Sequence, residues 1–430
     1  MAITTLAFLV LFAAACGGAM LRPMIGIVAY MLVYQVGPEN QWWTEPIAHW
    51  GIRYSFVLAA FTAAGIVINR RKLRCGRPFL VPHEYLLVAF VCVTWLSVLL
   101  GRPPEGEIVS ADWPPLKLTK ILIFALMLTH VSATLSDLNW VLWAYVIGGL
   151  FLGYQALTAP AWMMTEGRLD AIGGPDFRQA NGLAVYLLAA LPIIGVQFMR
   201  SRWPGRLLCL ASGAMAVNAI VMTRSRGAVM GAAGVLVVAL VIAPKGLRKA
   251  AFAGVILAAI GAYALTDAAF WERASTTTAS DEERDGSAQS RIEIWKGSLA
   301  MLQDYWYGVG AGNFQAAIGQ YCPRHPKRDA HNTYVRCYSE LGIQGMAVFT
   351  ALILSAACML RRVYRDSLEL TEPYRKHVSW LSYALFLSLC GYLLCGLTGT
   401  LLYVEALYWL LALPVCLWRS ARNLAADKAD

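Results

Sequence analysis

Charged side chains are scarce in this chain. They make up 14% of its 430 residues, whereas hydrophobic side chains make up 58%, and the mean hydropathy is +0.53. A soluble domain needs roughly a quarter of its residues charged to cover its surface. The shortage therefore excludes an ordinary soluble enzyme or binding domain, and lipid must be the solvent for much of the surface. At about 20 residues per span, the chain has room for about a dozen helices and one sizeable loop.

Acidic residues are scarcer than basic ones, 26 against 36, which leaves a net charge of +10. Such an excess can indicate nucleic-acid binding, but here the basic residues stand in short clusters between apolar runs. That distribution is typical of the positive-inside rule for the cytoplasmic loops of membrane proteins. We therefore expect a lipid bilayer, and no nucleic acid, as a partner.

Motifs for metal chemistry are missing as well. The sequence has no HExxH, no paired aspartates and no CxxC cluster, and a Mg²⁺ site would need carboxylate ligands. We therefore expect no metal and no cofactor. Most of the ten cysteines lie in apolar runs, where a thiol behaves as a small hydrophobe. Cys322 and Cys337 lie in or beside the large polar loop, and their spacing leaves open whether they form a disulfide.

The apolar runs predict an all-α polytopic membrane protein with about 12–13 transmembrane helices. Basic clusters follow the third, seventh, ninth and eleventh runs and begin the C-terminal tail, and even numbers of spans separate them, so that all can share the cytoplasm. The side of the N-terminus stays open, because residues 1–37 fit two short spans or one interrupted element. The runs are 3–20, 23–37, 51–69, 82–100, 115–132, 138–158, 180–199, 206–222, 227–243, 249–266, 334–360, 378–397 and 401–418.

One long stretch, residues 267–333, is not committed to the membrane, and the topology places it outside the cytoplasm together with residues 101–113, 159–179 and 223–226. The chain therefore divides into N-terminal transmembrane helices (1–266), a large extracytoplasmic loop with short helices (267–333), and C-terminal transmembrane helices with a cytoplasmic tail (334–430).

Two local patterns stand out within this loop. Residues 291–303 place Ile292, Trp295, Leu299 and Leu302 on one face of a predicted amphipathic helix. The glycines of GVGAGNF (308–314) predict tight turns. A loop of this length is functional or disordered in most proteins.

Ionisable residues beside the outward ends of the apolar runs are candidates for function. TRSRGA (223–228) places Arg224 and Arg226 at a helix start, where positive charge and unpaired backbone N–H groups suit a phosphate or diphosphate. The alternative is that both arginines only reach the lipid headgroups.

DFRQANGLA (176–184) brings Arg178 and Asn181 to the start of the seventh run, although Asp176 and Asn181 would also serve as helix caps. AHNTYVRCYSELG (330–342) places His331 where the loop re-enters the membrane, with Arg336 on the next turn. A histidine is a suitable general base near neutral pH, and a helix cap is the alternative role. Few carboxylates are expected near these arginines, so the outward face predicts a cationic pocket for an anionic substrate.

Four pieces of the sequence together resemble the bacterial O-antigen ligase family, which also contains O-antigen polymerases and protein O-glycosylation ligases. They are FRQANGLA, TRSRGA, RIEIWKGSLAMLQDYWYGVGAGNF and HNTYVRCYSELGIQG, in this order between about residue 170 and residue 350. The N-terminal LRPMIGIVAY is similar to members linked to exopolysaccharide or glycosylation systems.

The resemblance implies a metal-independent, inverting glycosyltransferase of the bacterial inner membrane, with an active site that faces the periplasm. It would transfer a glycan from an undecaprenyl-diphosphate carrier to a glycan, lipid or protein acceptor. By resemblance, Arg226 and Arg291 hold the diphosphate, and His331 activates the acceptor or assists the leaving group. Further candidates for binding the diphosphate or glycan are Arg178, Arg224, Asn181, Asn332 and Arg336.

Alternatives stay open at this point. His325, in the basic piece YCPRHPKRDA, competes with His331 for the role of base. A polysaccharide polymerase would use the same donor site with a second lipid-linked unit as acceptor. A flippase or transporter of the lipid-linked glycan is the alternative from another class, and it predicts inverted repeats and charges near mid-membrane, whereas no repeat is visible.

Overall fold

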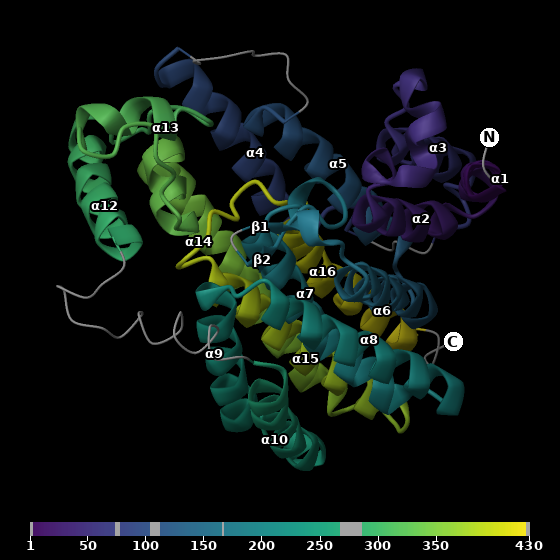
Figure 1. Ribbon diagram of the computed structural model, residues 1–430. Helices are drawn as coiled ribbons and strands as arrows, with labels where there is room; N and C mark the ends of the chain where they lie inside the picture. The colour runs from purple at the N-terminus through teal and green to yellow at the C-terminus, as the bar shows by residue number, and fades with distance from the viewer. Residues whose placement is uncertain (1–2, 74–77, 104–111, 166, 267–285, 427–430) are drawn as a thin grey trace.

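The computed structural model describes residues 3–73, 78–103, 112–165, 167–266 and 286–426, and helices dominate this part of the chain (Figure 1). Every predicted apolar run coincides with a helix. The α-helices before the large loop are α1 (Ile3–Leu21), α2 (Pro23–Val36), α3 (Tyr54–Ile68), α4 (Pro82–Leu100), α5 (Pro114–Val131), α6 (Leu135–Leu157), α7 (Ala180–Arg200), α8 (Trp203–Met222), α9 (Arg226–Ile242) and α10 (Arg248–Leu265). Those that follow are α12 (Gly286–Asp304), α13 (Phe314–Ala317), α14 (Thr333–Ser367), α15 (Tyr374–Cys395) and α16 (Glu405–Ala426).

The prediction of an all-α polytopic membrane protein is confirmed. Among the described residues, eight helices are long and apolar enough to cross a membrane, or up to nine if the bent pair Trp42–Trp50 and Tyr54–Ile68 counts as one span. Helix α2 has 14 residues and α9 has 17, so both are shorter than the roughly 20 residues of a full span. Residues 1–37 form two helices that meet at Arg22, and the side of the membrane on which the N-terminus lies stays open.

Short elements complete the described part of the chain. An antiparallel hairpin joins β1 (Met164–Thr165) to β2 (Arg168–Leu169), with Met164 opposite Leu169. The 3₁₀ helices are η1 (Pro38–Asn40), η2 (Trp42–Trp50), η3 (Ala161–Met163), η4 (Pro175–Phe177), η5 (Lys245–Leu247) and η6 (Ile318–Gln320).

Helices α1, α2 and α3 form one edge of the molecule, and α12 and α13 lie at the opposite edge beside the start of α14 (Figure 1). The first group packs through small residues. A Cβ added to Gly65 would lie 2.1 Å from the carbonyl oxygen of Ala19, so the two backbones approach closely. Small residues at contacts are how helices pack in lipid, where the hydrophobic effect does not drive them together.

Helix α14 is broken at Gly342, and the break shapes the candidate site. Gly342 has a φ of 72°, and a Cβ there would lie 2.3 Å from the carbonyl carbon of Tyr307. Only glycine accepts this backbone and this approach. The short piece before Gly342 is therefore set apart from the long span that follows it, and the glycine turn of the large loop packs against the break. Gly308, Gly310 and Gly312 in that turn all have positive φ, as tight turns require.

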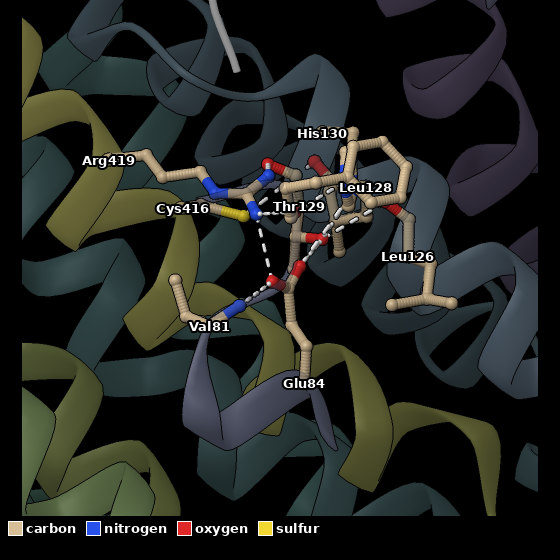
Figure 2. Close-up of polar contacts among 9 residues, drawn as sticks. Val81, Glu84, Leu126, Leu128, Thr129, His130, Cys416 and Arg419 are labelled. Atoms are coloured by element: carbon tan, nitrogen blue, oxygen red, sulfur yellow. Dashed lines mark hydrogen bonds and ion pairs between the residues drawn. The ribbon is translucent and has the colours of Figure 1, made fainter. Parts of the chain in front are cut away.

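A buried polar cluster ties α4, α5 and α16 together at one end of the bundle (Figure 2). Glu84 Oε2 accepts from Arg419 Nη2 at 2.8 Å, and the two side chains are 0% and 2% exposed. Glu84 also accepts from the hydroxyl of Thr129 and from the backbone N–H of Val81. The Arg419 guanidinium donates to the backbone carbonyls of Thr129 and Phe79. This cluster stabilises three helix ends at once.

The opposite end of the bundle gathers the segments that the topology placed outside the cytoplasm. The backbone N–H of Arg102 donates to the carbonyl of Val309 at 3.0 Å, which joins the α4–α5 connection to the large loop. The Nε of Arg168 donates to the carbonyl of Thr223 at 3.1 Å, which joins the hairpin to the α8–α9 connection. Segments far apart in the sequence thus meet at one end, and the candidate residues lie there.

Candidate functional site

His331 lies in the turn that leads into α14, and its side chain is 41% exposed. Its backbone N–H donates to Asp329 Oδ2 at 3.3 Å, and its Nδ1 lies 3.7 Å from the same oxygen. Burial lowers the pKa of His331, and the charges of Arg291 and Arg328 lower it further, although Asp329 opposes them. The imidazole is therefore neutral at pH 7 and able to accept a proton.

Asp329 is held in its charged form beside this histidine. Its Oδ1 accepts from Arg336 Nη1 at 2.8 Å, and its Oδ2 accepts from the hydroxyl of Thr400 at 2.5 Å. Burial raises the pKa of Asp329, but Arg336, the Thr400 hydroxyl and His331 together hold it below its usual value. A carboxylate in this position orients the imidazole and stabilises the imidazolium that forms when the ring takes up a proton.

Arg336 is paired by two carboxylates, so the expectation of few carboxylates near the outward arginines is wrong here. Its Nε donates to Glu340 Oε1 at 2.8 Å, and its side chain is 16% exposed. Glu340 in turn accepts from the Tyr403 hydroxyl at 2.5 Å and from the backbone N–H of Phe314 at 3.2 Å. Sequence spacing did not reveal Asp329 as a partner. In this arrangement Arg336 positions Asp329, and direct contact of Arg336 with substrate stays a prediction.

Helix α12 brings Arg291 toward His331. Trp295, one helical turn after Arg291, donates from its indole Nε1 to the carbonyl of Ala330 at 2.8 Å. Residues four apart lie on the same side of a helix, so Arg291 lies on the side that contacts the His331 turn. The effect of the Arg291 charge on the pKa of His331 agrees with this placement.

The buried face of α12 differs from the predicted one. Ile292 and Leu299, two of the predicted face residues, are 38% and 56% exposed. The side chains that pack inward are Ile294, Ser298 and Met301, none more than 1% exposed. Of the predicted face, Trp295 does pack against the buried cluster. Apolar residues occur on both faces of this helix, so periodicity alone identified the packed face only in part. The residues 267–285 at the start of the predicted loop lie outside the described part of the chain.

The TRSRGA piece forms the short connection between α8 and α9. Ser225 is the N-cap of α9 and accepts from the backbone N–H of Ala228, so Arg226 is the first residue of the helix. Arg224 has a φ of 46°, and a Cβ added to Gly167 would lie 2.9 Å from its Nη1. Arg226 therefore lies at the positive end of a helix, as predicted, and the β1–β2 hairpin approaches Arg224.

Two candidate residues share a backbone conformation that side-chain-bearing residues rarely adopt. Arg224 and His331 both have a φ of 46°. Such left-handed conformations cost about 1–3 kcal/mol and persist only where the surroundings impose them, most often at functional sites. The two turns are therefore held in shape by their neighbours.

Asn181 connects the start of α7 to the α8–α9 connection. Its Oδ1 accepts from the hydroxyl of Ser225 and from Arg168 Nη2, both at 2.9 Å. The second candidate of this piece points elsewhere, because Arg178 donates from Nη1 to Asn40 Oδ1 at 2.6 Å and is exposed. The structure thus brings Asn181, but not Arg178, to the TRSRGA connection.

Asn332 is a helix cap. Its Oδ1 accepts from the backbone N–H groups of Tyr334 and Val335 at 2.9 and 3.1 Å, and its Nδ2 donates to the carbonyl of Leu397 at 3.1 Å. Asn332 is 6% exposed, so its amide is occupied by the protein itself. Contact with a glycan, predicted from the sequence, stays untested.

The connection between α15 and α16, yellow in Figure 1, was missed by the sequence reasoning. Thr333 donates from its backbone N–H to the carbonyl of Gly396 and from its hydroxyl to the carbonyl of Gly399. Thr400 binds Asp329. The run GLTGT (396–400) is short, small and polar, and by the span count it faces outward. This outward position is the one feature of the sequence that could have identified the α15–α16 connection as part of the site.

This connection also reaches α9. Cys395 Sγ donates to the carbonyl of Gly227 at 3.5 Å, and a Cβ added to Gly227 would lie 2.2 Å from the Thr398 hydroxyl oxygen. Residues 395–400 therefore link the start of α9, which carries Arg226, to the turn that carries His331. The three predicted catalytic residues belong to one connected region.

Asp176 is a second residue whose role the sequence did not reveal. It accepts from Lys117 Nζ at 2.6 Å, from the Tyr34 hydroxyl at 2.5 Å and from the backbone N–H of Glu405 at 2.7 Å. The alternative that Asp176 caps α7 is thus replaced by a network that joins α2, α5 and α16. Asp170 instead accepts from the backbone N–H of Ala180, the first residue of α7.

The rival histidine has its own partner. His325 Nε2 lies 3.2 Å from Glu293 Oε2. Cys322 and Cys337, whose pairing was open, are both buried free thiols. Among the described residues, no group of three or more His, Cys, Asp or Glu side chains is arranged to hold a metal ion.

Comparison with known proteins bears on the same region. Residues 211–350 match the model of a family described as O-antigen ligase. The match runs from α8 into α14 and contains Arg226, Arg291 and His331. No curated protein matches the chain.

Proposed function

We propose that this chain, a multi-pass bacterial membrane protein of the O-antigen ligase family, transfers a glycan from an undecaprenyl-diphosphate carrier to an acceptor at the periplasmic face. The family implies an enzyme of the glycosyl-transfer type. The donor, the orientation in the inner membrane and the metal-independent, inverting course of the reaction are parts of the proposal.

One observation supports it most strongly. A neutral histidine lies beside a half-buried, charged aspartate and is influenced by the charge of Arg291. Residues 395–400 join this turn to the helix that begins at Arg226. A base next to arginines is what glycosyl transfer from a diphosphate needs. The base activates a hydroxyl, and the cations stabilise the negative charge that develops on the departing diphosphate.

The proposed step is a single displacement. The acceptor hydroxyl oxygen attacks the anomeric carbon, and its proton passes to His331. The bond from the anomeric carbon to the phosphate oxygen breaks, and its electron pair stays on the diphosphate. Arg226 and Arg291 bind that leaving group, and Asp329 stabilises the imidazolium. Attack opposite the leaving group inverts the anomeric centre.

The test is a transfer assay in liposomes with a lipid-diphosphate-linked oligosaccharide and three acceptors in parallel, a lipid A core, a second lipid-linked unit and a peptide. We expect transfer to one acceptor in the presence of EDTA, with inverted linkage in the product. The acceptor consumed distinguishes ligase, polymerase and protein glycosylation.

A matched control uses Arg328→Ala, because Arg328 is an exposed arginine of the same loop that the proposed step does not use. Arg226→Ala and Arg291→Ala are expected to lose transfer, and Arg328→Ala to keep it. If no acceptor is glycosylated but the lipid-linked glycan moves to the other leaflet, the proposal is wrong and the protein is a flippase of that glycan.

A further inference from the structure

A cavity of about 410 Å³ opens at the end of the bundle opposite His331. Helix α7 begins at the TRSRGA connection and ends at the cavity, and its 21 residues span about 30 Å. The cavity lies where the start of α6, the end of α7, and the starts of α8 and α15 meet. Its lining is Asn139, Trp143, Gln197, Arg200, Ser201, Arg202, Pro204, Gly205 and His377.

The lining carries basic groups and no carboxylate. Arg200 donates from Nη1 to Gln197 Oε1 at 2.9 Å, and Gln197 donates from Nε2 to Asn139 Oδ1 at 3.0 Å. The Nε of Arg200 is buried and has no hydrogen-bond partner among the residues that the structure describes. The positive charge of Arg200 is partly buried without a carboxylate in the lining, which is costly, so an anion that enters the cavity would balance this charge.

The start of α8 adds a second source of positive potential. The N-cap position of α8 is Arg202, whose side chain makes no capping hydrogen bond, and Pro204 stands in the first turn. The first backbone N–H groups of a helix point outward at its positive end, and together with arginine they form an anion site. Arg202 and Gly205 of this turn line the cavity, together with Pro204, which has no backbone N–H to offer an anion.

Aromatic side chains place this cavity at the edge of the membrane. Trp203 and Trp140, on the helices that form it, are 68% and 51% exposed, as in the tryptophan belts at headgroup level. Basic pockets between transmembrane helices at that level bind the phosphates of anionic lipids. Glu372, the acidic residue whose charge reaches His377, is not part of the lining.

We propose that this cavity binds a phosphate group, held by Arg200, Arg202 and the start of α8. The group belongs to the headgroup of an anionic lipid, and inorganic phosphate shares its chemistry. The site is separate from the proposed transfer site.

The test measures binding to the purified full-length protein in nanodiscs of phosphatidylcholine, titrated with phosphatidylglycerol in one arm and with inorganic phosphate in the other. Native mass spectrometry counts bound lipid, and calorimetry follows phosphate. Arg200→Gln with Arg202→Gln is the test variant. Arg206→Gln is the matched control, since Arg206 is an exposed arginine of the same helix that stacks on Phe198 and does not line the cavity.

We expect phosphatidylglycerol to bind the unaltered protein and the Arg206→Gln variant alike, and the double variant about tenfold or more weakly, because charge-assisted hydrogen bonds are lost. Binding of inorganic phosphate with the same dependence on the two arginines supports the site and identifies a soluble occupant. No saturable binding of either probe to the unaltered protein overturns the proposal, whether or not the variant folds. So does equal weakening in the Arg206→Gln control, which indicates attraction by net charge alone.

Discussion

Two arginine–carboxylate networks lie at opposite ends of this protein and differ in how far they are closed. Glu84 and Arg419 are 0% and 2% exposed, and their contact is 2.8 Å. Asp329 and Arg336 have a contact of the same length but are 20% and 16% exposed. The second network also continues to His331, whose side chain is 41% exposed.

This difference in exposure indicates the role of each network. Both oxygens of Glu84 accept hydrogen bonds from neighbouring helices, so the carboxylate of the first network is fully paired and joins α4, α5 and α16 (Figure 2). The Nε of Arg419 is the one atom of this ion pair without a partner among the described residues. In the second, one oxygen of Asp329 also faces an accessible imidazole. A closed polar network makes a core rigid. An open one of the same chemistry holds a reactive group in place.

Removal of the Arg419 guanidinium should change the stability of the fold more than any other substitution considered. Arg419→Ala leaves Glu84 buried without its cation, and the loss of one partner of a buried pair costs about 3–5 kcal/mol. We expect a strong fall in the thermal unfolding temperature in detergent. The matched control is Arg422→Ala, one turn later on α16 and exposed, which should unfold close to the unaltered protein. Equal effects of the two would remove the contrast between the networks.

At the open end we expect loss of activity without loss of stability. His331→Ala should lower transfer by about 10²- to 10⁴-fold, because a general base is removed, while the unfolding temperature stays nearly unchanged. His325→Ala is the control, since His325 has Glu293 as its partner. If His325→Ala proves the more damaging of the two, the role of base belongs to His325.

Asp329→Asn tests how the network acts on His331. The negative charge of Asp329 raises the pKa of His331, so removal of this charge lowers the pKa. The acid limb of the pH–rate profile for transfer should therefore move to lower pH. The rate at neutral pH should fall by about 10- to 100-fold, because the imidazolium loses its counter-charge. A variant that is slower but keeps the same acid limb would mean that Asp329 has only a structural role.

The smallest expected effect comes from Arg328→Gln. The charge of Arg328 lowers the pKa of His331, so its removal raises that pKa and moves the acid limb to higher pH, by less than about one unit. The rate at neutral pH should hardly change. Because Arg328 is exposed, the shift should shrink as salt is added; a shift to lower pH would contradict the electrostatic account of His331.

Much of the fold follows from the sequence, since every predicted apolar run forms a helix and the outward segments meet at one end. What the sequence did not supply is which face of α12 packs inward. Ile292 and Leu299 are exposed, whereas Ile294 and Met301 are buried. In a membrane protein an apolar face fits lipid as well as protein, so periodicity cannot decide between them.

The candidate residues were found by local signals, and their partners were not. Arg226 and His331 stand at helix starts that can be read from neighbouring residues. The pairing of Arg336 with Asp329 and the contact of Asp329 with Thr400 depend on how α14 and the α15–α16 connection pack. Contacts between segments that are distant along the chain produce no periodic pattern of residues, so a single sequence does not reveal them.

The most direct test separates donor binding from transfer in the same variants. The affinity for the lipid-diphosphate-linked glycan and the rate of transfer would be measured side by side for the unaltered protein, Arg226→Ala, Arg291→Ala and His331→Ala. We expect the two arginine variants to bind the donor weakly, and His331→Ala to bind it normally without transferring it. Normal donor binding by both arginine variants, or loss of donor binding in His331→Ala, would contradict it.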